Sequence, residues 1–192
     1  MKKLFSVLFV AAFCNVLTAA DILTGKIAVG YSDAPTIRYW LSEKIGLEGK
    51  FSLRWNNSSD PSFTYKNSYY SISAIGIYNI KKTKIVNFNA NTLIGYSYED
   101  YKYSYINSAG LYTGNYLSNK KNSYYLGIGP EFEVFIPPVP NLSLSSSILL
   151  YYSYRSNSNI FQFYKTKYIS REIYFSGDGF TVLGLSVRYY FN

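Results

Sequence analysis

The fold can be worked out from one stretch, Thr181-Val-Leu-Gly-Leu-Ser-Val-Arg-Tyr-Tyr-Phe-Asn192. Odd positions from Leu183 to Phe191 are apolar or aromatic, and the even positions between them are Gly, Ser, Arg and Tyr. Successive side chains of a β-strand point to opposite faces, so this alternation predicts a strand with an apolar face and a face that carries Arg188. We interpret the stretch as the closing strand of a membrane β-barrel, with its apolar face toward lipid.

Seven earlier segments show the same alternation of apolar and polar residues. They span residues 23–31, 36–41, 46–55, 68–80, 85–98, 123–136 and 142–154. A tilted strand needs roughly 9–11 residues to cross a bilayer, a length that most of these segments reach and the second does not. The fourth segment leaves its phase open, because Ile75 and Ile77 compete with Tyr70 and Ile72 for the apolar face.

The connections between these segments alternate in length. Short ones at 42–45, 81–84 and 137–141 are expected on the periplasmic side, and long polar loops at 56–67, 100–122 and 155–178 on the outside; the outer turn at 32–35 is short. Short inner turns and long outer loops are typical of outer-membrane barrels. Because backbone groups in lipid must pair within the protein, the sheet must close. The predicted fold class is all-β, an eight-stranded antiparallel up-and-down transmembrane β-barrel.

The first 20 residues have the pattern of a cleaved signal peptide. Lys2 and Lys3 provide a positive start, residues 4–16 are mostly apolar, and small residues precede cleavage before Asp21. A membrane-anchor helix is the alternative, and the short apolar run counts against it. We therefore predict an exported chain with a signal peptide at 1–20 and an outer-membrane β-barrel domain at 21–192.

Composition supports a membrane barrel and argues against a nucleic-acid partner. Aromatic residues make up 20% of the chain and charged residues only 16%, which is low for a soluble surface. Without Lys2 and Lys3 the chain has 17 basic and 11 acidic residues, a net charge of +6. The basic residues are scattered, with no cluster among stacking aromatics, so membrane phosphates suit them better. Outer-loop residues could meet lipopolysaccharide or simply be solvated: Lys120, Lys121, Lys165, Lys167 and Arg171.

The inward faces of the predicted strands carry three carboxylates and five cations. We expect these to form a lumen charge network of Lys26, Arg38, Glu48, Lys50, Arg54, Glu131, Glu133 and Arg188. An eight-stranded barrel has an interior that side chains just fill, and unpaired charges there would cost several kcal/mol each. The same faces carry Asn87, Asn89 and Asn91, which could line a water path or simply fill the lumen.

Aromatic residues gather at both ends of the outward faces. Those near the periplasm are Tyr39, Tyr78, Tyr189 and Phe191, and those near the outer face are Tyr31, Trp55, Tyr96, Tyr98, Tyr124, Tyr152 and Tyr154. Amphipathic rings settle at the two membrane–water interfaces. The sequence therefore predicts two aromatic girdles.

The leader, the eight segments, the piece at 37–49 and the end Leu185-Ser-Val-Arg-Tyr-Tyr-Phe-Asn192 resemble the OmpA/OmpX-type small outer-membrane barrels. The resemblance implies a monomer in the Gram-negative outer membrane, in contact with outer-membrane lipids and lipopolysaccharide. It also implies that the barrel-assembly machinery reads an assembly signal formed by Val187, Tyr189 and Phe191. Asn192 displaces the usual terminal aromatic by one residue.

No catalytic, cofactor or metal site is expected. Small outer-membrane barrels include enzymes that use a catalytic His, and the chain has no His; its one Cys, Cys14, lies in the leader. Glu131 and Glu133 share a face and could do acid–base chemistry, but pairing with Arg or Lys accounts for them better. The Gly-x-Gly pairs at 127–129 and 177–179 open no helix, so neither predicts a nucleotide loop.

Three functional hypotheses follow. The first is a barrel with a filled lumen that acts in outer-membrane structure or surface interaction through its Tyr/Asn/Ser-rich loops. The second is a narrow porin for small solutes, suggested by the Asn and Ser residues of the inward faces. The third, a soluble secreted β-barrel, is the weakest of the three.

Overall fold

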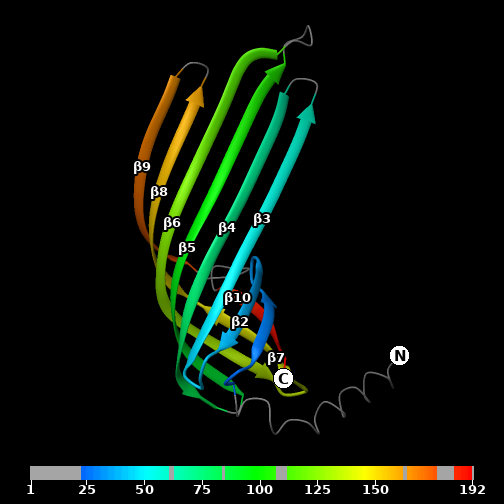
Figure 1. The fold of residues 1–192 in the computed structure, drawn as a ribbon, viewed down its shortest axis with the longest axis vertical. Helices are drawn as coiled ribbons and strands as arrows, with labels where there is room; N and C mark the ends of the chain where they lie inside the picture. The colour runs from blue at the N-terminus through cyan, green and yellow to red at the C-terminus, as the bar shows by residue number, and fades with distance from the viewer. Residues whose placement is uncertain are drawn as a thin grey trace, which may run out of the picture.

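The computed structural model describes residues 23–60, 63–83, 85–106, 112–161, 164–176 and 184–191 (Figure 1). The predicted signal peptide and parts of several connections lie outside these ranges. In the described part of the chain, no helix is long and apolar enough to cross a membrane.

The described residues form one antiparallel sheet. Its ten strands are β1 (Ile27–Tyr31), β2 (Pro35–Trp40), β3 (Ile45–Asp60), β4 (Phe63–Lys82), β5 (Val86–Ile106), β6 (Tyr112–Ile136), β7 (Val139–Ser147), β8 (Leu149–Phe161), β9 (Tyr164–Ser176) and β10 (Leu185–Phe191). Neighbours in the sheet pair antiparallel throughout.

Eight of these strands close into a ring. In the order β1–β2–β3–β4–β5–β6–β7–β10 each strand pairs with the next, and β10 pairs back with β1. At the closure Val29 lies between Ile37 of β2 and Tyr189 of β10. The prediction of an eight-stranded antiparallel barrel is therefore confirmed, and the last strand pairs with the first as expected.

The predicted strand 142–154 is divided in two. Ile148 separates β7 from β8, and its amide donates a hydrogen bond to the Pro130 carbonyl at 3.2 Å. β7 stays in the ring between β6 and β10, whereas β8 pairs with an earlier part of β6 and carries β9 on its other side. This division lets one chain segment serve both the ring and an extension of the sheet.

The three predicted outer loops are wrong. Residues 56–60 and 63–67 continue β3 and β4, residues 100–106 and 112–122 continue β5 and β6, and residues 155–161 and 164–176 belong to β8 and β9. Most residues of these stretches are Tyr, Ser, Asn and Lys, so no continuous aliphatic face signals a strand, although Tyr101, Tyr103 and Tyr105 alternate with polar residues. Tyrosine nevertheless favours strands, and each strand gains backbone pairing with its neighbour.

The sheet continues well beyond one end of the ring (Figure 1). Six strands, β3, β4, β5, β6, β8 and β9, continue past the short β1–β2 turn as an open sheet. We define this projecting sheet as residues 54–60, 63–69, 99–106, 112–121, 157–161 and 164–168. One of its faces continues the inner wall of the barrel, and we call it the inner face.

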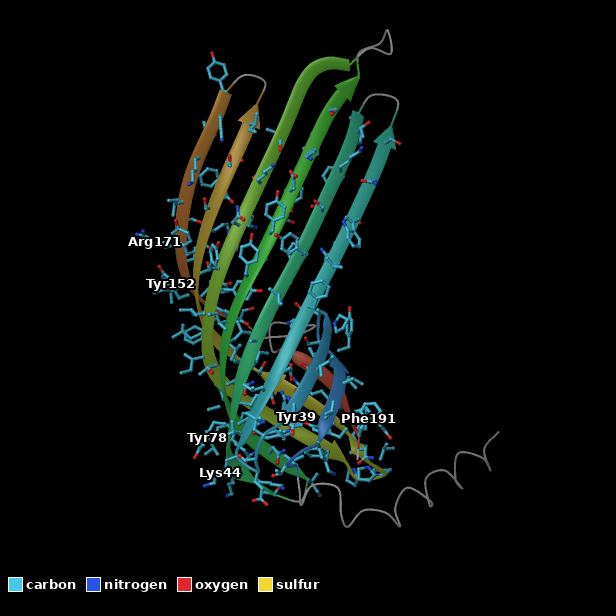
Figure 2. All side chains as sticks on the ribbon, viewed as in Figure 1. Tyr39, Lys44, Tyr78, Tyr152, Arg171 and Phe191 are labelled. Carbon is cyan, nitrogen blue, oxygen red and sulfur yellow. The ribbon has the colours of Figure 1, made fainter. Side chains whose placement is uncertain are left out.

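The outward face of the barrel is apolar. Ile37 is 61% exposed and Ile94 is 62% exposed in the isolated chain. In β4, Ile72 lies on this outward face, whereas Ile75 is 1% exposed and lies inside, which settles the phase that the sequence left open. The end of the barrel away from the projecting sheet carries the aromatic residues Tyr39, Tyr78 and Phe191, at the bottom of Figure 2.

An apolar cluster fills part of the barrel interior. It contains Leu23, Ala28, Trp40, Ile75, Ile77, Leu93, Phe135, Leu149, Tyr151 and Tyr190. The lumen is therefore a packed core as well as a polar one. Alternation predicted the inward position of Tyr190, but the cluster as a whole was not predicted from the sequence.

Candidate functional site

The interior of the barrel is crossed by a buried ion-pair network centred on Arg38. The Arg38 guanidinium donates through Nε to Glu48 Oε2 at 2.7 Å, and through Nη1 and Nη2 to the two oxygens of Glu131 at 2.9 Å each. Nη1 also reaches Glu133 at 3.3 Å. Bidentate pairing of this kind fixes geometry as well as contributing energy. One side chain from β2 is thereby tied to β3 and to β6 across the barrel.

Arg188 of β10 completes the network. Its Nε and Nη2 donate to the two oxygens of Glu48 at 2.9 and 3.2 Å, and Nη2 lies 3.5 Å from Glu131. Nη1 donates to the hydroxyl of Ser145. The closing strand is thus joined to β3 through Glu48 and to its neighbour β7.

Neutral hydrogen-bond donors stabilise the excess negative charge of the network. The network pairs two guanidinium groups with three carboxylates, all almost fully buried. Amide donors reach Glu131 from Asn89 at 3.0 Å and from Asn91 at 3.1 Å. Glu133 accepts bonds from the hydroxyls of Ser143 at 2.8 Å and Tyr190 at 2.7 Å. Since a buried charge needs such partners, the Asn ladder acts as structural support for the carboxylates.

Three residues of the predicted network lie elsewhere. Lys50 pairs with Asp33 of the β1–β2 turn. Arg54 is exposed in the projecting sheet, with its guanidinium carbon 5.8 Å from the centre of the Tyr69 ring. Lys26 precedes β1 and is half-buried. The inward phase was right for Arg54, but β3 extends so far that this residue lies beyond the closed ring.

A glycine makes room for the network. A Cβ atom at Gly30 would lie 2.7 Å from Cγ of Arg188 and 2.5 Å from the Val187 carbonyl oxygen. Gly30 and Arg188 face each other across the β1–β10 closure. The small residue therefore allows the arginine stem to pass into the lumen.

The proposed assembly-signal residues lie on the outward face of β10. Val187, Tyr189 and Phe191 are 39%, 42% and 48% exposed, and the rings of Tyr189 and Phe191 meet edge to face at 5.1 Å. Phe191 and Tyr39 lie on opposite sides of Ile27 at the same level of the barrel. The two aromatics are thus matched in position as well as in exposure.

The inner face of the projecting sheet is rich in tyrosine and asparagine. The Tyr65 ring lies 4.8 Å from that of Tyr103 and 6.3 Å from that of Tyr101. Burial, and then the hydrogen bond donated to Glu99, raise the pKa of Tyr101 above its usual value, so its hydroxyl stays protonated. This surface was not predicted from the sequence, because its residues were expected to form loops.

The opposite face of the projecting sheet is basic. Lys66 and Lys102 face each other on β4 and β5, and Lys120 lies opposite Asp100 on the next pair. Lys165, Lys167 and Arg171 share the same face on β9. Lys121, which was expected in an outer loop beside Lys120, points the other way and pairs with Glu99 at 3.6 Å.

No described group of three or more His, Cys, Asp or Glu residues could hold a metal ion. The three lumen carboxylates instead contact guanidinium, amide and hydroxyl groups. The arrangement therefore supports a structural role for this cluster.

Comparisons with known proteins give two similar structures. No protein-family model matches the chain, and a search of curated proteins found no match. The chain is similar to a major outer membrane protein from Thermus thermophilus, with 13% identity, 86% of this chain and 98% of that chain covered, and a TM-score of 0.46. It is also similar to Ail, the attachment invasion locus protein of Yersinia pestis, with 17% identity, 86% and 93% covered, and a TM-score of 0.41.

Proposed function

We propose that the protein is an integral outer-membrane barrel that acts in surface interaction through its projecting sheet. One observation carries this proposal: six strands continue beyond the closed ring as a sheet with two polar faces. A barrel needed only to seal a membrane has no use for such an extension. Interaction with material outside the cell is the function that this extension supports best.

The apolar outward face supports a membrane location. Large side chains such as Ile37, Ile72 and Ile94 are more than half exposed on the same outward face of the ring strands. Soluble monomers rarely expose continuous apolar patches larger than a few hundred Å². A lipid environment would cover this surface, and aromatic residues lie at both of its ends, as in membrane barrels.

Outer-membrane lipids and lipopolysaccharide are the proposed surroundings of the sheet's basic face. Along the outward face of the strands, the lysines Lys66, Lys102 and Lys120 lie just beyond the tyrosines Tyr70 and Tyr98. Phosphate groups at the membrane surface would meet these cations there. We further propose that the protein is a monomer and that the barrel-assembly machinery reads its terminal strand.

The filled lumen favours surface interaction over a narrow porin. Purified protein in planar bilayers should give no steady channels, and vesicles that contain it should take up small solutes no faster than empty ones. Cells that make the protein should adhere to coated surfaces better than cells that lack it. Steady open channels, or adhesion equal to that of the deletion strain, would contradict the proposal.

A further inference from the structure

We propose that the inner face of the projecting sheet is a binding site for an uncharged polysaccharide. The inference rests on the proposed function, because the sheet must stand outside the membrane to meet such a ligand. Three features of the inner face carry it: amide groups with unused acceptors, a group of tyrosine rings, and charges that are largely neutralised by one another.

Four asparagines of this face have unused hydrogen-bonding capacity. Among the described residues, no group donates to the side-chain oxygens of Asn67, Asn119, Asn157 and Asn159. Asn67 and Asn157 are 9% and 5% exposed. Buried polar atoms without a partner are costly and native proteins seldom keep them. Rotating an amide by half a turn exchanges the positions of its donor and its acceptor, so each amide can either donate a hydrogen bond to a sugar hydroxyl or accept one from it.

These asparagines lie close together across the strands. Asn119 of β6 faces Tyr101 of β5 on one side and Asn159 of β8 on the other. Asn157 faces Lys121 and Tyr168 one row away. The amides therefore lie in two neighbouring rows of the sheet, with tyrosine side chains among them.

Tyrosine rings give the patch flat apolar surface. Tyr65, Tyr101 and Tyr103 form one group, and Tyr69 lies under Arg54. Each ring combines an apolar body with a polar tip. Sugar rings have the complementary chemistry, because their C–H faces pack on aromatic rings while their hydroxyls bond to amides and phenols.

The charges of the inner face are largely neutralised within it. Glu99 accepts from Tyr101 and pairs with Lys121, and Arg155, just below, pairs with Glu172 at 3.5 Å. A sulfated or phosphorylated chain would find no cluster of unpaired cations here. Among the described side chains of the inner face, Leu117 and Phe63 are the only wholly apolar ones, and both lie toward the far end of the sheet, so the face lacks the apolar centre of a typical protein interface.

The dimensions suit an extended chain. Six strands spaced by about 4.8 Å span about 24 Å from β3 to β9. Several sugar units can lie across this width, each meeting the side chains of one or two strands. A polysaccharide is therefore favoured over a single sugar.

The test uses the whole barrel in lipid nanodiscs. Binding would be measured to an uncharged panel of dextran, galactomannan and a β-glucan, and to heparin and hyaluronate as acidic chains. The double variant Asn119→Ala/Asn159→Ala removes two facing amides. We expect it to bind the uncharged chain about tenfold more weakly, because it removes two amides that can form hydrogen bonds with sugar hydroxyls. Asn57→Ala, on the basic face of β3, is the matched control and should bind like the wild type.

Every outcome bears on the inference. Binding of an uncharged chain that is lost in the double variant and kept in Asn57→Ala supports it. No binding to the uncharged panel, binding to acidic chains only, or equal binding by the double variant overturns it. A far-ultraviolet circular dichroism spectrum equal to that of the wild type shows that the β-sheet of the double variant is intact. Biotinylation of Lys66 and Lys102 on intact cells separates the two proposals: labelled lysines without polysaccharide binding contradict this inference alone.

Discussion

Arg38 is the residue on which the interior depends most. It pairs with Glu48, Glu131 and Glu133 and is fully buried. Replacing it by Met leaves three carboxylates with too few cations. Removing one partner from a buried ion pair typically costs about 3–5 kcal/mol, and we expect Arg38→Met to lower the free energy of unfolding by this amount.

The measurement of Arg38→Met is urea unfolding in detergent, followed by the fluorescence of Trp40. The chain has two tryptophans, Trp40 and Trp55, and Trp55 is 69% exposed. A Trp55→Phe background leaves Trp40 as the single reporter. Arg54→Met is the control and should unfold like the parent, because Arg54 is exposed. Equal stability of the two methionine variants would show that the network contributes little.

Gly30 provides a second test at this scale. Gly30→Ala places a methyl group against Arg188 and the Val187 carbonyl, and overpacking of this kind costs about 1–3 kcal/mol. Gly49 is the matched control, since a Cβ there would have no atom within 4 Å. Urea unfolding of the two alanine variants compares them. If Gly49→Ala is as destabilising as Gly30→Ala, the crowding argument fails.

Some of these residue positions could be predicted from sequence and others could not. Alternation places Arg38, Glu131 and Arg188 on inward faces because the strand period is two. Which carboxylate meets which arginine depends on the register between strands, and that is set by pairing of the whole ring. The partner of Lys50 is a turn residue, Asp33, which lies outside any strand pattern.

At the scale of elements, β10 closes the ring and carries the proposed assembly signal. We expect Phe191→Ala to slow membrane insertion more than it destabilises the folded barrel. Tyr39→Ala is a close control, because Tyr39 has similar exposure and lies across Ile27 at the same level. Insertion can be followed by the shift in gel mobility between unheated and heated samples. Equal insertion rates for the two variants would count against a special role for Phe191.

The projecting strands could not be predicted from the alternation of apolar and polar residues. The ring strands were found because one face is apolar and the other polar. In the stretch 100–106, Tyr101, Tyr103 and Tyr105 alternate with polar residues, but the tyrosine face is not aliphatic and the stretch was therefore predicted as a loop. The tyrosine content was the available clue, and it was attributed to aromatic girdles and surface loops.

At the scale of the whole molecule, the chain combines a closed ring with a projecting sheet. The network and the apolar cluster occupy the ring interior, and the sheet extends from one end (Figure 1). The membrane boundary should therefore fall along the strands themselves, between outward isoleucines and outward lysines. The proposed surface interaction depends on this boundary, because it requires the projecting sheet to lie outside the membrane.

Site-directed spin labelling tests that boundary most directly. The one cysteine, Cys14, lies in the predicted leader, so single cysteines can be placed at Ile72, Ile94, Lys66 and Lys102 of the protein in bilayers. Labels at Ile72 and Ile94 should collide mainly with oxygen, which concentrates in lipid. Labels at Lys66 and Lys102 should collide mainly with a water-soluble nickel chelate. Nickel access at Ile94 equal to that at Lys102 would contradict the account.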